Sequence, residues 1–195
     1  MGTKRIGLSR QEHLFENLKR DLAMGGSSLR GTRRKVLRQT VFGAARTLTV
    51  AESGALILLD EDAVTNITLP IITSSDYIGV SYEFLETVVS DNARGIHTSW
   101  PADHFVGGVS NLFDAAGDTD VLVTFVSAGA TDTTIRVDDN LANCGGGLGT
   151  NFTVTAIAAR PLTTDPAALV WLVQGVKVAQ AATDTGADTF RTALE

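Results

Sequence analysis

The sequence predicts a mainly β protein: an antiparallel β-sandwich or jelly-roll-like body that follows an N-terminal basic arm with a short helix. Short apolar runs such as VLVTFV at 121–126 alternate with turn-forming Gly, Asp, Asn and Ser. Several segments, NFTVTAIA at 151–158 among them, alternate apolar and polar residues, as expected of strands with one buried face. No helical pattern between these runs is long enough for a crossover, which favours antiparallel sheets over a parallel α/β fold.

Length and composition predict one main domain. The chain has 195 residues, of which 44% are hydrophobic and 19% charged, so it can bury a full core. Its 19 glycines and low aromatic content of 6% are typical of a turn-rich globular protein rather than a disordered one. We expect a basic arm at residues 1–45, a β-sandwich body at 46–180 and a loose C-terminal tail at 181–195.

The arm contains one segment with helical periodicity. Ser9 and Glu12 have the spacing of a capping box, and apolar side chains recur every three or four positions after them. A short amphipathic helix is therefore predicted over residues 11–24, ended by Gly25 and Gly26. The apolar stripe of this helix consists of Leu14, Phe15, Leu18 and Leu22.

Charge is divided unequally along the chain. Residues 1–46 hold eleven basic against three acidic side chains, a balance of +8; the whole chain is at −6, so residues 47–195 carry −14. A basic arm on an acidic body seeks acidic protein surface or nucleic acid. The basic residues are Lys4, Arg5, Arg10, Lys19, Arg20, Arg30, Arg33, Arg34, Lys35, Arg38 and Arg46.

The basic cluster at the end of the arm has two interpretations. It is either a solvated tail or a docking arm that becomes ordered on a partner. For the docking arm, the candidate residues are Leu14, Phe15, Leu18, Leu22, Arg33, Arg34, Lys35 and Arg38. No aromatic residues are interleaved with the basic ones for base stacking, so sequence-specific nucleic-acid binding is a minor option.

The body is predicted to contain a series of short strands joined by turns. Its acidic turn at 60–62 separates two of them, and a glycine bulge is expected within the run FVGGVSNLF. The predicted strands are residues 48–50, 55–59, 64–69, one or two within 77–89, 105–113, 121–126, 133–137, 151–158 and, as a strand pair or one long bent strand, 168–178.

Few residues are candidates for chemistry. His97 and His104, with Asp103 between them, form the one cluster suited to metal or acid–base chemistry, but their spacing matches no recognised zinc site, and we expect structural histidines in a loop. The run GGGLG at 145–149 lacks the GK[ST] of a phosphate loop and leads into a strand. Cys144 has no base beside it in the sequence.

Acidic turns complete the search for a site. Carboxylates in turns can bind calcium, but the residue pattern of a calcium-binding loop is absent from both groups of turn aspartates. These groups are Asp114, Asp118 and Asp120, and Asp132, Asp138 and Asp139. No nucleophile elbow is present. We therefore expect no enzyme activity, no cofactor and no metal.

The sequence also predicts the compartment. No apolar run approaches the roughly 18 residues of a membrane span, and the N-terminus is charged where a signal peptide needs apolar residues. A single cysteine excludes an intramolecular disulfide framework. We expect synthesis in a reducing cytoplasm and no contact with a membrane.

The run LTVAESGALILLDEDAVTNITLP, at residues 48–70, resembles a recurring segment of tailed-bacteriophage virion proteins. The later segments NFTVTAIAAR and VWLVQGV look like closing strands of that family, so the resemblance covers about residues 46–178. The matching residues of the first segment are Leu48, Thr49, Ala51, Glu52, Ser53, Gly54, Leu58, Leu59, Ile67, Thr68, Leu69 and Pro70.

This resemblance implies a structural role in a virion, as a head decoration (cement) protein. Members of that group are often compact β-domains that assemble as trimers and clamp neighbouring major capsid protein subunits. The long basic arm departs from the simplest members. A head fibre, a tail component or a receptor- or carbohydrate-binding module therefore stays an alternative, in which His97 and Trp100 would bind a sugar ring.

Overall fold

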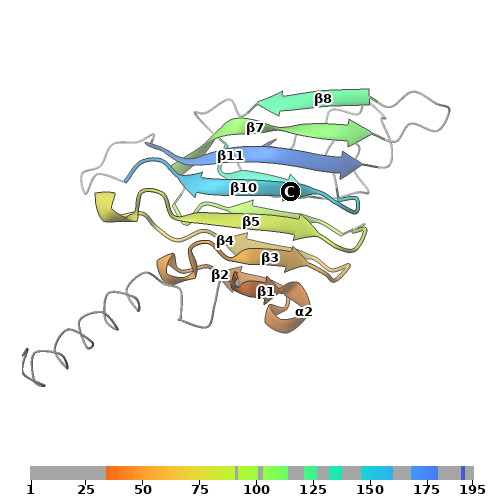
Figure 1. Ribbon diagram of the computed structural model, residues 1–195, viewed down its shortest axis with the longest axis horizontal. Coiled ribbons are helices and arrows are strands. Elements are labelled where there is room, and N and C mark those ends of the chain that lie inside the picture. Colours follow the sequence, from red (N-terminus) through yellow and green to blue (C-terminus); the bar gives the residue numbers. More distant parts are fainter. Residues whose placement is uncertain are drawn as a thin grey trace, which may run out of the picture. The chain divides into compact units, whose positions relative to one another are not determined.

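The computed structural model describes residues 34–90, 92–100, 103–113, 121–126, 132–137, 146–159, 168–179 and 190–191. The chain divides into two compact units, Met1–Arg34 and Lys35–Glu195, and the described strands all lie in the second (Figure 1). The predicted helix at 11–24 lies outside the described residues. The second unit is mainly β, as predicted.

The body begins earlier than predicted. Residues 35–47, which were assigned largely to the arm, form two strands and a turn of helix that belong to the second unit. The strands are β1 (Val36–Arg38), β2 (Ala45–Thr47), β3 (Leu56–Leu59), β4 (Thr65–Thr68), β5 (Ser81–Glu86), β6 (Arg94–His97), β7 (Asp103–Phe113), β8 (Val121–Val126), β9 (Thr134–Val137), β10 (Asn151–Ala156), β11 (Ala168–Ala179) and β12 (Phe190–Arg191). Short helical turns are α2 (Gln39–Phe42), η1 (Val50–Glu52) and η2 (Ser75–Tyr77).

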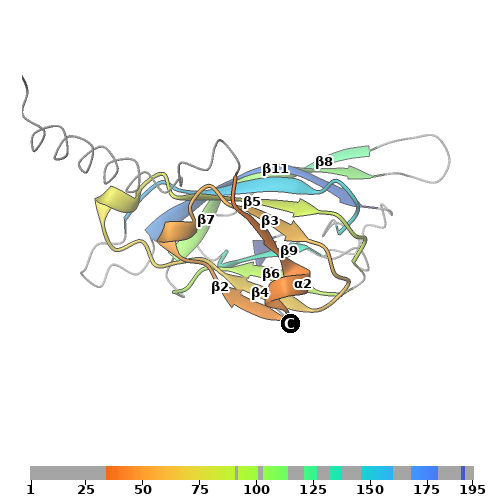
Figure 2. The same ribbon diagram turned by 60° about the horizontal axis from the view of Figure 1, so that its bottom comes forward.

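The strands form two sheets, which lie one over the other in Figure 2. The seven-stranded sheet has the order β1-β3-β5-β10-β11-β7-β8, and the five-stranded sheet has the order β12-β9-β6-β4-β2. From β1 to β6 the chain alternates between them, odd-numbered strands entering the first sheet and even-numbered strands the second. Each pair of consecutive strands is therefore one coil around both sheets, and β1 and β2 make the first coil, residues 35–47.

The sheets are mixed, so the prediction of antiparallel sheets was wrong. Among the described residues five strand pairs are parallel, namely β1·β3, β3·β5, β2·β4, β4·β6 and β7·β11, and five are antiparallel. Parallel strands need a crossover connection. In four of the five parallel pairs, all but β7·β11, one strand of the opposite sheet makes the crossover, which is why the lack of long helices did not exclude parallel pairing.

Most of the predicted strands are present, with three local differences. The segment 48–50 is no strand: Leu48 is buried, and the chain then turns through η1, where Thr49 and Glu52 form a capping box. Strand β6 occupies a segment predicted as turn and loop. Strand β12 pairs with β9 within the predicted tail.

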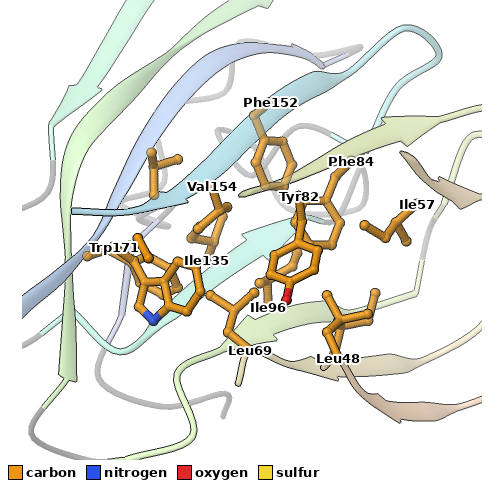
Figure 3. Packing of buried hydrophobic residues seen from close by; sticks show 14 of the residues in the cluster. Leu48, Ile57, Leu69, Tyr82, Phe84, Ile96, Ile135, Phe152, Val154 and Trp171 are labelled. Carbon is orange, nitrogen blue, oxygen red and sulfur yellow. The ribbon is translucent and has the colours of Figure 1, made fainter. Parts of the chain in front are cut away.

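The core lies between the two sheets and is one cluster of buried side chains (Figure 3). Alternation places Tyr82 and Phe84 of β5 on the inner side, where Phe84 stacks on its cross-strand partner Phe152 with ring centroids 5.1 Å apart. The five-stranded sheet contributes Ile96 and Ile135, both at most 1% exposed. Burial of this kind is worth about 1.5–3 kcal/mol for each large apolar side chain.

Strand β7 requires glycine at position 107. The register with β11 runs without a break through Gly107 and Gly108, so the predicted glycine bulge is absent there; the irregularity lies on β11, between Leu169 and Trp171. Gly107 has a φ of 98°, and a Cβ at this position would overlap the carbonyl oxygen of Val173. Close approach of two strands, rather than a bulge, therefore requires glycine here.

Candidate docking surface on the first coil

The first coil is the part of the predicted docking arm that the structure describes. Leu14, Phe15, Leu18, Leu22 and Arg33 lie outside the described residues. Arg34 ends the first unit, whereas Lys35 and Arg38 belong to the body. With the boundary at 34, the eight basic and three acidic residues of 1–34 give +5, and the body, residues 35–195, carries −11.

Glu52 anchors one end of the first coil. Its carboxylate accepts hydrogen bonds from Lys35 Nζ at 2.9 Å, from Arg46 at 2.5 Å and from the backbone N–H of Thr49 at 3.0 Å. Burial by itself raises the pKa of this carboxyl, but the bonds from Lys35, Thr49 and Arg46 outweigh it and lower the pKa to about 2. Glu52 thus ties β1 and β2 to the turn that leads into β3.

Asp60 anchors the other end of the first coil. It accepts from Arg38 Nε at 2.5 Å, from the backbone N–H of Thr40 at 2.9 Å and from the Thr40 hydroxyl at 3.1 Å. Burial opposes ionisation here too, and the bonds from Thr40 and Arg38 lower the pKa of Asp60 below its usual value. The first coil is therefore held to β3 at both ends of that strand by carboxylates.

The cations of the first coil remain accessible. The side chains of Lys35 and Arg38 are 55% and 59% exposed although each is paired, and no acidic residue occurs between positions 35 and 47. The carboxylates of these pairs, Glu52 and Asp60, are only 9% and 5% exposed, so a partner that drew the cations away would leave a largely buried carboxylate with fewer partners. The first coil therefore presents the basic side chains of Lys35 and Arg38 on an otherwise acidic body.

The histidines His97 and His104 were expected in a loop, but both lie in strands, and these strands belong to different sheets. His97 is on β6, in the five-stranded sheet, whereas Asp103 and His104 begin β7 in the other sheet and are buried. His97 Nδ1 lies 3.0 Å from the Thr134 hydroxyl and Nε2 lies 3.0 Å from Asn66 Oδ1. Burial lowers the pKa of His97. Both ring nitrogens are thus engaged across β4, β6 and β9.

The other candidate residues are placed differently. Cys144 and Asp114, Asp118, Asp120, Asp138 and Asp139 lie outside the described residues, and Asp132 is buried before β9. In the described ranges no three His, Cys, Asp or Glu side chains are grouped so as to hold a metal ion. The end of the glycine run lies against β11, where the N–H of Gly147 donates to the carbonyl of Val178 at 2.8 Å.

Sequence reasoning missed the charged groups inside the core. Glu86 and Arg94 form an ion pair there, and Lys177 donates from its Nζ to the carbonyl oxygen of Arg136. Alternation carried the signal: Glu86 continues the inward positions of Tyr82 and Phe84. A charged residue at an inward position needs a buried partner, so the position of Glu86 in the alternation could have indicated a buried ion pair.

The described helices are all too short or too polar to cross a membrane. Comparisons with protein-family models, with curated proteins and with solved structures find no match to this chain.

Proposed function

We propose that this chain is a virion structural protein, a capsid decoration (cement) protein that self-associates, as a trimer, and clamps subunits of the major capsid protein through its N-terminal arm. The observation that carries the proposal is the division of charge, +5 in residues 1–34 against −11 in the body. A basic segment of this length attached to an acidic body is suited to an acidic protein surface, which the body itself repels.

The mechanism is multivalent binding. The body is proposed to be a β-sandwich or jelly-roll-like assembly module, and a trimer of bodies holds three arms at one place. Each arm becomes ordered when its apolar helix stripe and its basic cluster contact the capsid, so affinity comes from several weak contacts acting together. The protein is made in the host bacterial cytoplasm and resides in the virion. The resemblance of residues 48–70 to virion proteins supports this assignment.

Capsid binding after truncation tests the proposal. The variant lacking residues 1–34 keeps the whole compact body, including the bonds of Lys35 and Arg38. It should fold, yet fail to co-sediment with capsids of the phage that encodes the chain. Binding of the full chain should weaken as salt is raised, because exposed charges are screened. Full occupancy by the truncated protein would overturn the docking arm.

Charge variants of the arm supply the matched control. Arg30→Glu combined with Arg33→Glu reverses two charges outside the body, whereas Arg30→Lys with Arg33→Lys keeps them. The reversed pair should lower occupancy severalfold, and the conservative pair should retain it. Equal loss in both pairs would show that guanidinium geometry, not net charge, decides binding.

A carbohydrate- or receptor-binding module of a head fibre or tail is the second candidate. Exposed aromatic side chains favour it: Trp100 is 45% and Tyr77 40% exposed, and both lie in connections from an even-numbered to an odd-numbered strand, at the same end of the sheets. Aromatic rings stack on sugar rings. Binding to a glycan array that is lost in Trp100→Ala but kept in Leu148→Ala, a change at the opposite end, would support it. An array without signal would reject it.

A further inference from the structure

The seven-stranded sheet has two open edges. Among the described residues β1 and β8 each pair on one side only, β1 with β3 and β8 with β7. Strand β8 is six residues long and its sequence, VLVTFV, contains no charge. Natural sheets protect such edges with charge, proline or a cover, because an unpaired apolar strand is a template for another strand. Strand β8 has neither charge nor proline and is therefore suited to pairing.

Strand β1 offers the matching groups at the opposite edge. Leu56 donates its N–H to the carbonyl of Lys35, and alternation in a parallel pair then turns Leu37 toward β3. The N–H and C=O of Val36 and the N–H of Arg38 consequently face away from the sheet. Val36 is 48% exposed, and among the described residues β1 pairs with β3 alone.

Strand direction favours a join between these two edges. Strand β1 is parallel to β3 and β5, and two antiparallel steps through β10 restore its direction at β11 and β7. Strand β8 is antiparallel to β7 and so runs opposite to β1. A second copy rotated about an axis along the strands would therefore bring its β8 antiparallel to β1, in the more stable of the two pairings.

Charge is complementary at the two edges. Lys35 directly precedes β1 and Arg38 is its last residue, and both cationic side chains are exposed. In the sequence, Asp114, Asp118 and Asp120 immediately precede β8, and no basic residue lies between positions 114 and 120. A segment with this charge next to β8 in the sequence would be attracted to the basic side chains near β1 of another copy.

We propose that copies of this chain join head to tail, with β8 of one copy added as an antiparallel strand to β1 of the next. The contact uses different surfaces on the two copies, so it closes into a ring such as a trimer, or continues as a filament if the rotation does not close. The inference rests on the self-association in the proposed function and supplies its surface, but it does not require capsid binding.

Two variants, each disabling one edge, test the join. Val36→Pro removes an outward N–H from β1 without touching the bonds to β3, because proline is tolerated at the first residue of a strand. Leu122→Lys with Thr124→Lys places two cations on β8, opposite Leu112 and Ser110 of β7, where they repel the basic β1 edge. Ala45→Pro, at the exposed edge strand β2 of the other sheet, is the matched control.

Sedimentation of the full-length chains gives the readout. The wild type and Ala45→Pro should form the same oligomer, each edge variant alone should be a monomer, and an equimolar mixture of the two edge variants should give a 1:1 dimer through the remaining good pair of edges. Thermal unfolding verifies that every variant is folded. A monomeric wild type at all concentrations, or a mixture that stays monomeric, would overturn the inference.

The outcome is separable from that of the proposed function. A chain that assembles by these edges but does not bind capsids would contradict capsid decoration and keep the head-to-tail join. A chain that binds capsids but stays monomeric in the mixing experiment would contradict the head-to-tail join and support capsid binding.

Discussion

Glu86 at the end of β5 and Arg94 at the start of β6 form an ion pair between the two sheets, with side chains 0% and 1% exposed. Arg94 also donates to the carbonyl oxygen of Glu61, so its guanidinium holds the loop after β3 as well. The pair thus joins two connections at one end of the core, β3–β4 and β5–β6.

Removing one partner of this pair should be far more costly than removing both. Glu86→Gln removes the Glu86 carboxylate from the buried Arg94 guanidinium and should lower the free energy of unfolding by about 3–5 kcal/mol. Glu86→Leu combined with Arg94→Met should cost much less than the two single changes together, since no charge stays buried. Urea denaturation of the variants measures both. A loss below about 1 kcal/mol in Glu86→Gln would contradict the buried pair.

Stability should decline in acid through Glu52. Its folded pKa, about 2, is below the ordinary value of 4.5, so the unfolded chain takes up the proton first; the contribution is complete above pH 4.5 and is lost as the pH falls toward 2. At about 1.4 kcal/mol per pKa unit the contribution is at most about 3 kcal/mol, reduced by solvent around Lys35. In Glu52→Gln the free energy of unfolding should vary less between these pH values. Parallel curves for the two proteins would refute this.

Two glycines separate backbone strain from steric overlap. Gly107 and Gly79 have φ values of 98° and 95°, but a Cβ at Gly79 meets nothing within 4 Å, whereas one at Gly107 would overlap the Val173 carbonyl. Gly79→Ala should cost only the strain, about 1–2 kcal/mol. Gly107→Ala should cost several kcal/mol or prevent folding, since β7 and β11 must move apart. Equal unfolding midpoints for the two variants would argue against close approach of these strands.

The first coil should mark where truncation begins to damage the body. Deleting residues 1–34 should leave the unfolding midpoint unchanged. Deleting residues 1–38 also removes β1, so that Glu52 loses Lys35, Asp60 loses Arg38 and β3 becomes an edge strand. We expect a loss of about 2 kcal/mol or more from the longer deletion, measured by thermal and urea unfolding. Equal stability of the two truncated chains would contradict the boundary at residue 34.

The extent to which sequence predicted the fold depends on where each segment finds its partners. Strand β10 was predictable because apolar residues alternate with polar ones along it. Strand β1 was not predictable, because its basic residues are typical of a solvated segment. The carboxylates that they contact lie 17 and 22 positions away in the sequence. Strand β6 was missed because Asn92 and Gly95 are typical turn residues, and the partners that accompany burial of Arg94, such as Glu86 and Glu61, lie elsewhere in the sequence.

Parallel pairing was hidden for a related reason. A strand that carries the chain across to the other sheet does the work of a crossover helix, but its sequence looks like any other strand. For the docking residues, the apolar stripe at 14–22 lies outside the described part, and the sequence cannot distinguish cations that bind a partner from those, such as Lys35, that also hold the fold together.

The alternation of the chain between sheets also has a consequence for how the molecule forms. Contacts such as Val36 with Leu56, or Thr65 with Arg94, join neighbouring coils and close short loops, so coils can add one after another in the manner of a repeat protein. The long parallel pairing of β7 with β11 brings together distant segments, Phe105 with Trp171 for instance, and must close a far larger loop. We expect the pairing of β7 with β11 to set the folding rate. The first coil should change this rate little, whether it pairs with β3 early or late in folding.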